Sequence, residues 1–174
     1  MKGKQHIAFR VHSASVSVDG QIVSSIGKGV LAFAAVSRDD TLRDSEQCAA
    51  KILKIRLWDS NDEKGGRWKH NVTDINGEVL CVSQFTLLAS TKKGSKPDFH
   101  KSAGPDKGRE LYTAFFKKVQ DLYDHEKVKD GVFQAMMDVS LINDGPVTLE
   151  INTDPAPLNA DDEASSMSVK DTTT

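Results

Sequence analysis

The chain has 174 residues, of which 38% are hydrophobic and 28% are charged, and its formal net charge is −2. These values are typical of one globular domain with a single sizeable core. No apolar stretch approaches the roughly 18 residues that span a bilayer, and the first residues lack the long apolar segment of a secretory signal. We therefore expect a cytoplasmic protein with no membrane partner.

The charge is spread unevenly along the chain. Residues 152–174 carry five acidic residues and one basic residue, so the remainder is slightly basic. This segment is rich in Pro, Ala, Ser, Thr and Asp and has no apolar periodicity, so it cannot bury enough surface to offset the entropy of ordering. The sequence therefore predicts a folded domain over residues 1–151, followed by an acidic, disordered tail over residues 152–174.

The N-terminal half predicts strands and then a helix. Strand patterns occupy residues 5–11 and 14–27, and the second contains Asp19-Gly20, a strong two-residue hairpin turn. Residues 29–37 form an apolar run short enough for a buried strand. Between residues 38 and 58 the apolar spacing changes to that of a helix, with Asp39, Asp40 or Thr41 as the N-cap. The expected inward positions are Leu42, Cys48, Ala49, Ile52, Leu53 and Leu57. Residues 60–66 are expected to form a loop.

The C-terminal half repeats this pattern. Asn76-Gly77 predicts a tight hairpin that leads into a strand ending near residue 88, and residues 90–108 form a loop long enough to suggest function. A second amphipathic helix is expected over residues 108–123. Its inward positions are Leu111, Ala114, Phe115, Val119 and Leu122. Strands are expected over residues 127–144 and 146–151. Adjacent strand pairs with two interspersed helices predict an α+β fold with antiparallel sheets.

Cofactor and metal motifs are not evident in the sequence. The two cysteines, Cys48 and Cys81, are expected to be core thiols and not a disulfide framework. The five histidines are scattered and have no partner at metal-ligand spacing. No glycine-rich nucleotide-binding motif is present. We therefore expect neither a metal ion nor a cofactor.

Residues 82–87, "VSQFTL", place polar side chains inside an otherwise apolar strand pattern. On a regular strand Gln84 and Thr86 share one face, while Ser83 and Phe85 point the other way. Burying a polar group without a partner costs about 1–3 kcal/mol. Two interpretations stay open: these residues bond to neighbouring backbone, or they line a cleft in which a ligand completes their hydrogen bonds.

Two further segments have both a structural and a functional interpretation. Asn143-Asp144-Gly145-Pro146 forms either a simple turn or an exposed, stiff feature between two strands. About 5–6% of X–Pro bonds are cis, and spacing alone does not assign one here. The loop over residues 92–109 is rich in lysine. It is either a solvated loop or a surface that contacts phosphates.

The motif "VSQFTL", followed some sixty residues later by "NDGPVT", resembles the D-aminoacyl-tRNA deacylase family, formerly called D-tyrosyl-tRNA deacylases. Supporting matches are "RVHSASVSVDG", "KPDFH" and "GVFQAMMDVSLINDGPVT". The resemblance covers about residues 4–151 and leaves out the tail. It implies a barrel-like core with two main helices, and hydrolysis of the ester between a D-amino acid and the terminal adenosine of tRNA. It also implies a homodimer whose active sites form at the subunit interface.

The resemblance also assigns roles to residues. It implies a pocket for adenosine and the scissile ester, lined by Ser83, Gln84, Phe85 and Thr86. Gly145 and Pro146 match a Gly-cisPro motif that inserts into the partner's pocket, and Arg10, with Asn143, matches residues that support that motif. The family has glutamine before this arginine, whereas Phe9 stands here, so no polar contact is expected from position 9. Candidate tRNA contacts are Lys92, Lys93, Lys96 and Lys101.

The expected mechanism needs no strong base, because the ester is already activated. Backbone N–H groups around Phe85 and Thr86 would stabilise the oxyanion. Thr86 is expected to position the substrate, whose own ribose hydroxyl assists hydrolysis. Carbonyls of Gly145-Pro146 would hold the amino group so that an L side chain collides with the wall; glycine has no such side chain, so glycyl-tRNA is a further expected substrate. The alternatives are a nucleic-acid-binding or interaction protein on the same scaffold, and an ordinary serine esterase.

Overall fold

The computed structural model describes residues 6–60, 65–92 and 94–152. Its elements are β1 (His6–Val18), β2 (Gln21–Ile26), β3 (Gly29–Ala34), α1 (Leu42–Lys54), β4 (Trp58–Ser60), β5 (Gly66–His70), β6 (Glu78–Ser83), the 3-10 helix η1 (Phe85–Leu88), α2 (Pro105–Leu122), β7 (Val128–Asp130) and β8 (Asp138–Ile151). The predicted α+β class with two main helices is confirmed.

The main sheet is mixed, so the expectation of purely antiparallel sheets was wrong. Strand β1 pairs antiparallel with β2, β3 and β8, whereas β6 lies parallel to both β3 and β7. Parallel neighbours need a long crossover connection. Helix α1 lies in the connection from β3 to β6, and α2 lies in the connection from β6 to β7. The two helices are therefore what makes the parallel pairs possible.

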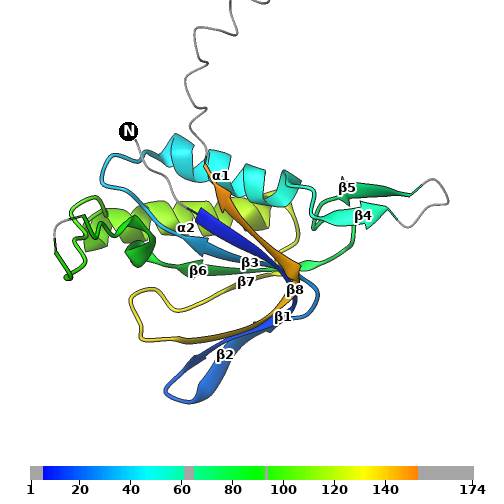
Figure 1. Cartoon of the computed structure of the whole chain (residues 1–174), viewed down its shortest axis with the longest axis horizontal. Helices are drawn as coiled ribbons and strands as arrows, with labels where there is room; N and C mark the ends of the chain where they lie inside the picture. The colour runs from blue at the N-terminus through cyan, green and yellow to red at the C-terminus, as the bar shows by residue number, and fades with distance from the viewer. Residues whose placement is uncertain (1–5, 61–64, 93, 153–174) are drawn as a thin grey trace, which may run out of the picture.

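The sheet curls until β2 contacts β6 and β7, which gives the barrel-like shape. The Ser24 hydroxyl in β2 donates to the Asp130 carbonyl in β7 at 2.6 Å. One apolar core fills the inside of this curl, and a larger one lies between the sheet and the helices. Figure 1 shows α1 and α2 lying together over one side of the sheet, with the β1–β2 end curling away on the other.

Most N-terminal predictions are confirmed. Asp19 and Gly20 have positive φ angles of 50° and 76° and join β1 to β2, although β1 is one long strand. Thr41 is the N-cap of α1 and forms a capping box with Asp44. Leu42 is wrong as an inward residue, because it begins the helix on the outer side and is 55% exposed. The other predicted inward residues are buried.

The C-terminal half differs more. Asn76-Gly77 closes a turn in which the Gly77 N–H donates to the Val72 carbonyl at 2.9 Å, and no hairpin follows, because β5 pairs with β4. Helix α2 begins three residues early, at Pro105, since proline suits the first helical position. Its Leu122 is 48% exposed, and Tyr112 is buried instead. The expected division into strands over residues 127–144 and 146–151 was wrong: the break lies between β7 and β8, and β8 continues through residues 144–146.

Other expectations have mixed outcomes. Cys48 and Cys81 are fully buried and no disulfide joins them, as predicted. Burial raises the pKa of the Cys81 thiol well above its ordinary value. Within the described ranges no helix has both the length and the apolar character needed to cross a membrane. The predicted tail beyond Asn152 lies outside the described residues.

Candidate functional site

The polar residues after β6 do not lie inside a strand, so that expectation was wrong. Strand β6 ends at Ser83, whose partner Ala34 is also the last residue of β3. The Gln84 N–H donates to the Ala34 carbonyl at 2.8 Å, and the chain then turns into η1. Strand alternation no longer applies, and Ser83, Gln84, Phe85 and Thr86 all line the same cleft.

This cleft has a volume of about 770 Å³, which is within the range of small-molecule sites. Its walls come from the ends of β3 and β6, the beginning of α2 and the segment between β7 and β8. Among the described residues that line it, none has a carboxylate, imidazole or amine side chain. The described lining side chains therefore place no general base at the cleft wall.

Hydrogen bonds and ring contacts hold the floor of the cleft. The Gln84 side-chain amide donates to the Thr86 hydroxyl. The Phe85 ring meets Phe99 edge-on at 5.1 Å, and the Ser102 hydroxyl donates to the Phe85 carbonyl at 3.2 Å. The first N–H groups of a helix have no acceptor within it, so η1 itself supplies no acceptor for those of Phe85 and Thr86.

Tyr112 is an ionisable residue that lines the cleft, and it is not suited to act as a base. Its hydroxyl donates to the Asp130 carboxylate. Burial, reinforced by Cys81 and Asp130, raises the pKa of Tyr112 well above its ordinary value. Burial also raises the pKa of Asp130, against the lowering effect of the hydrogen bonds from Tyr112 and the Gly131 N–H. The pair therefore supports the wall structurally.

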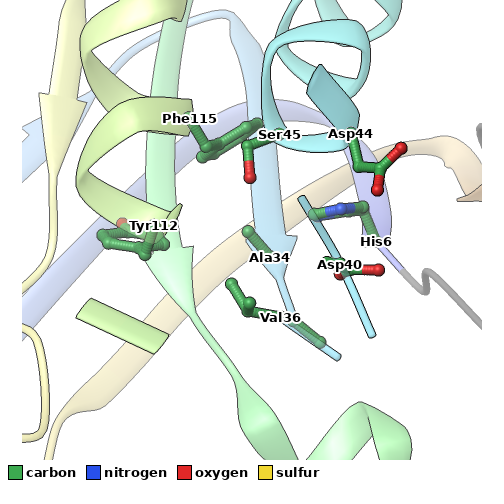
Figure 2. A pocket seen from close by; sticks show the side chains of 9 residues that line it. His6, Ala34, Val36, Asp40, Asp44, Ser45, Tyr112 and Phe115 are labelled. Atoms are coloured by element: carbon green, nitrogen blue, oxygen red, sulfur yellow. The ribbon is translucent and has the colours of Figure 1, made fainter. Parts of the chain in front are cut away.

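A second, much smaller cavity lies behind the cleft and shares Ala34, Val36 and Tyr112 with it. Figure 2 shows Asp40, Asp44, Ser45 and His6 around this space. His6 stacks on Phe115 with ring centroids 5.6 Å apart. The volume is about 10 Å³, which is roughly that of one water molecule. The cavity is therefore too small for a substrate.

Gly145 and Pro146 form an exposed feature within β8, joined by a cis peptide bond. Gly145 has a φ of 129°, which side-chain-bearing residues rarely adopt, and an added Cβ would lie 2.7 Å from Val147 Cγ2. The preceding residue, Asp144, is held by Arg10. The Arg10 Nε donates to the Asp144 carbonyl at 3.0 Å and lies 3.2 Å from the Asp144 carboxylate.

Two further contacts hold this segment. The Arg10 Nη1 donates to the Leu57 carbonyl at 2.5 Å, which ties the segment to the end of the α1 region. Asn143 accepts the Val147 N–H at 2.9 Å and donates to the Thr148 hydroxyl at 2.9 Å. The sequence did not predict that Asp144 and Leu57 hold Arg10. Asp144 is part of the quoted motif, but both residues accept hydrogen bonds through their backbone carbonyls, which any residue type provides.

The structure thus gathers the predicted residues into two groups. Ser83 to Thr86 line the cleft, whereas Arg10, Asn143, Gly145 and Pro146 lie together elsewhere, and none of residues 143–147 lines the cleft of the same chain. Lys92, Lys96 and Lys101 are exposed on the loop that follows η1, and Lys93 lies outside the described residues. No metal-binding group of three His, Cys, Asp or Glu occurs in the described part of the chain.

Comparison with known proteins gives a consistent result. Residues 7–152 match the family model described as D-Tyr-tRNA(Tyr) deacylase. The D-aminoacyl-tRNA deacylase of Yarrowia lipolytica is 51% identical over 145 residues, covering 83% of this chain and 94% of that protein. The Saccharomyces cerevisiae protein of the same name is 44% identical, with 83% and 95% coverage.

Two solved structures share the fold. One, a c-Myc DNA Unwinding Element Binding Protein, has a TM-score of 0.79 and 40% identity and covers 87% of this chain and 99% of that one. The other, a probable eukaryotic D-amino acid tRNA deacylase, has a TM-score of 0.72 and covers 85% and 98%. At 17% identity, this second likeness concerns the fold alone.

Proposed function

The chain belongs to the D-Tyr-tRNA(Tyr) deacylase family, and we propose that it hydrolyses the ester bond of D-aminoacyl-tRNA. The products are the free D-amino acid and tRNA, so the reaction removes wrongly charged tRNA before translation. The observation that carries this proposal is the cleft lined by Ser83–Thr86, which lies within the region matched by the family model, residues 7–152. The proposed place of action is the cytoplasm, where aminoacyl-tRNA is used.

The proposed chemistry depends on positioning. Water attacks the ester carbonyl, and the N–H groups of Phe85 and Thr86 stabilise the negative charge that develops on its oxygen. One such donor contributes about 2.7–4 kcal/mol in other enzymes. A Thr86 nucleophile would need a base, and none of the described lining side chains supplies one. Thr86, bonded to Gln84, therefore positions the substrate, and the ribose hydroxyl of the terminal adenosine assists proton transfer.

We further propose that the active protein is a homodimer in which Gly145-Pro146 of one subunit completes the cleft of the other. The motif is exposed and lies away from its own cleft. Apolar side chains are exposed nearby on β8, with Ile142 at 60% and Leu149 at 36%. A second copy of the chain would cover them. The size of the protein in solution, measured by light scattering, tests this; a monomer that is fully active contradicts it.

Selection for the D form follows from this arrangement. If backbone carbonyls of the Gly145-Pro146 motif hold the substrate's amino group, the side chain of an L residue is directed into the wall of the cleft. Because L-amino acids are rejected by a steric clash, the site needs to distinguish little between the side chains of different D-amino acids. Glycine has no side chain to collide, so glycyl-tRNA is proposed as a further substrate.

We propose that residues 1–151 form the deacylase domain and that residues 152–174 are dispensable for catalysis. The match to the family model, which covers residues 7–152, supports a domain of about this extent.

A second candidate is a nucleic-acid-binding protein, favoured by the 40% identity to the c-Myc DNA Unwinding Element Binding Protein. The two candidates differ in the fate of the substrate: incubation with D-aminoacyl-tRNA releases the amino acid if the chain is a deacylase, and leaves it attached if the chain only binds. A small D-amino acid ester without RNA serves as the comparison, because a general esterase hydrolyses both and the proposed enzyme prefers the tRNA.

A further inference from the structure

The segment between β7 and β8 forms one wall of the cleft and is attached to α2 through Arg109. The Arg109 Nη2 donates to the Gln134 side-chain oxygen at 2.7 Å. The guanidinium carbon lies 4.7 Å from the centre of the Phe133 ring. Phe133 and Gln134 line the cleft, whereas Arg109 does not. Arg109 therefore holds two wall residues from outside the site.

The same stretch of α2 contacts Phe133 at further points. Tyr112 lies one helical turn after Arg109, on the same side of the helix, and its ring centre is 5.6 Å from that of Phe133. A Cβ added at Gly108 would lie 3.7 Å from Phe133 Cζ, so the ring packs close to the helix backbone. The Phe133 ring is thus located by one turn of α2.

Other contacts secure the beginning of the segment and leave its middle free. The Tyr112 hydroxyl donates to Asp130, and the Gly131 N–H donates to the Cys81 carbonyl at 2.8 Å. Beyond Gly131, two hydrogen bonds are internal to the segment: the Ala135 N–H donates to the Val132 carbonyl at 3.2 Å, and the Val132 N–H donates to the Met137 sulfur at 3.3 Å. Across the described ranges, the Arg109–Gln134 bond is the single hydrogen bond that joins residues 132–136 to another element. Met136, at the tip, is 92% exposed.

We propose that Arg109 is a positioning residue of the deacylation site, which fixes the width of the cleft by holding Phe133 and Gln134 in place. The inference rests on the proposed function. A planar guanidinium can lie over an aromatic ring and donate in its own plane at the same time. A lysine ammonium, as a single point charge, cannot hold both partners in this geometry.

The first test compares Arg109→Ala with the wild-type protein on D-aminoacyl-tRNA and on a D-aminoacylated adenosine. A looser wall weakens binding of the substrate and of the transition state equally, so KM rises while kcat changes little. We expect roughly a tenfold rise in KM, and the same rise for both substrates, because the effect arises inside the cleft. A rise confined to full-length tRNA would mean that Arg109 contacts the RNA, and would overturn the proposal.

The contacts of Arg109 with Phe133 and Gln134 are called the clamp. Matched variants distinguish loss of the clamp from loss of the positive charge alone. Arg109→Lys keeps the charge and should still raise KM several-fold, and Lys117→Ala, on an exposed position of the same helix, should leave KM unchanged. The salt dependence of KM should stay that of the wild type. In a Gln134→Ala, Phe133→Leu background, the Arg109→Ala change should have little further effect. Full recovery in Arg109→Lys, or additive effects in that background, contradicts the clamp.

Amide hydrogen exchange tests the clamp without any activity. Exchange of residues 132–136 should be faster in Arg109→Ala than in the wild type, with unchanged exchange in β6. If the wild-type protein does not hydrolyse D-aminoacyl-tRNA, the proposed function is wrong. The exchange measurement still tests whether Arg109 holds residues 132–136. Equal exchange rates in the two proteins would show that Arg109 does not hold the segment.

Discussion

Arg10 contacts two groups of Asp144, directly before Gly145: its Nε lies 3.0 Å from the backbone carbonyl and 3.2 Å from the carboxylate, and its Nη2 donates to the carboxylate at 3.3 Å. A further hydrogen bond, to the Leu57 carbonyl, anchors the arginine itself. One side chain from β1 thereby sets the direction in which β8 presents Gly145 and Pro146. In the proposed dimer this contact determines whether the motif reaches the partner's cleft in the right geometry.

Arg10→Lys should therefore impair deacylation in a dimer that still folds. A point charge cannot replace the forked contact, and losing hydrogen bonds of a charged group costs about 1.5–3 kcal/mol, which corresponds to roughly ten- to a hundredfold in rate. Arg43→Lys, the same substitution at an exposed position on α1, is the control and should be neutral. Single-turnover rates on D-aminoacyl-tRNA decide the matter; a wild-type rate in Arg10→Lys would show that these contacts are not needed.

Thr86→Ala should slow hydrolysis without stopping it. The variant loses the hydroxyl that Gln84 contacts, and one neutral hydrogen bond contributes about 0.5–1.5 kcal/mol, or roughly three- to tenfold in rate. Thr86→Ser, which keeps the hydroxyl, should lie closer to the wild type. Mass spectrometry of the enzyme during turnover should detect no aminoacylated Thr86. A trapped adduct at this residue would establish covalent catalysis instead.

The lysines of the loop after η1 should affect substrate binding more than turnover. Replacing Lys92, Lys93, Lys96 and Lys101 by alanine removes four positive charges from this loop, whose Ser102 and Phe99 contact Phe85 in the cleft. Each lost phosphate contact should reduce the slope of log KM against log salt by up to about one, with kcat nearly unchanged. An unaltered slope in this quadruple variant would identify the loop as merely solvated.

Asp130 should make the stability of the fold depend on pH. Because burial raises the pKa of Asp130 from its ordinary 3.8, the folded state binds this proton more tightly than the unfolded state does. The free energy of unfolding therefore falls as pH rises from about 4 to the raised pKa. Asp130→Asn keeps an acceptor for Tyr112 but has no carboxyl group to titrate, so its free energy of unfolding does not fall in this way. The melting temperature of the variant minus that of the wild type should therefore increase as pH rises over that interval. A difference that is independent of pH would contradict the assignment.

Local signals in the sequence predicted the elements well where short-range chemistry decides. The Asp19-Gly20 turn and the Thr41 cap are examples, since each depends on a few neighbouring residues. The end of β6 was mispredicted because it depends on where its partner β3 ends, at Ala34. The mixed sheet was missed for the same reason: strand direction depends on which distant strands pair.

The candidate site was predicted in part. Ser83 to Thr86 were found by motif, but their expected alternation was wrong once η1 replaced the strand. Asp130 and Tyr112 were not singled out, and Arg109 was counted only among the basic residues of the 92–109 loop, because their roles arise from contacts between α2 and the segment after β7. Such contacts between segments distant in sequence leave no periodic pattern to recognise.

The rates at which the chain deacylates matched D- and L-aminoacyl-tRNA, measured for the wild type and for Gly145→Ala, test the central claim most directly. We predict rapid loss of the D-amino acid from tRNA with the wild type, and an L rate close to the spontaneous one. Gly145→Ala should lose most of the D activity, because its Cβ would lie 2.7 Å from Val147 and 3.1 Å from Arg10 at a φ of 129°. If D-aminoacyl-tRNA is hydrolysed no faster with the wild-type protein than without it, or if the wild type hydrolyses the D and L forms equally, the account is contradicted.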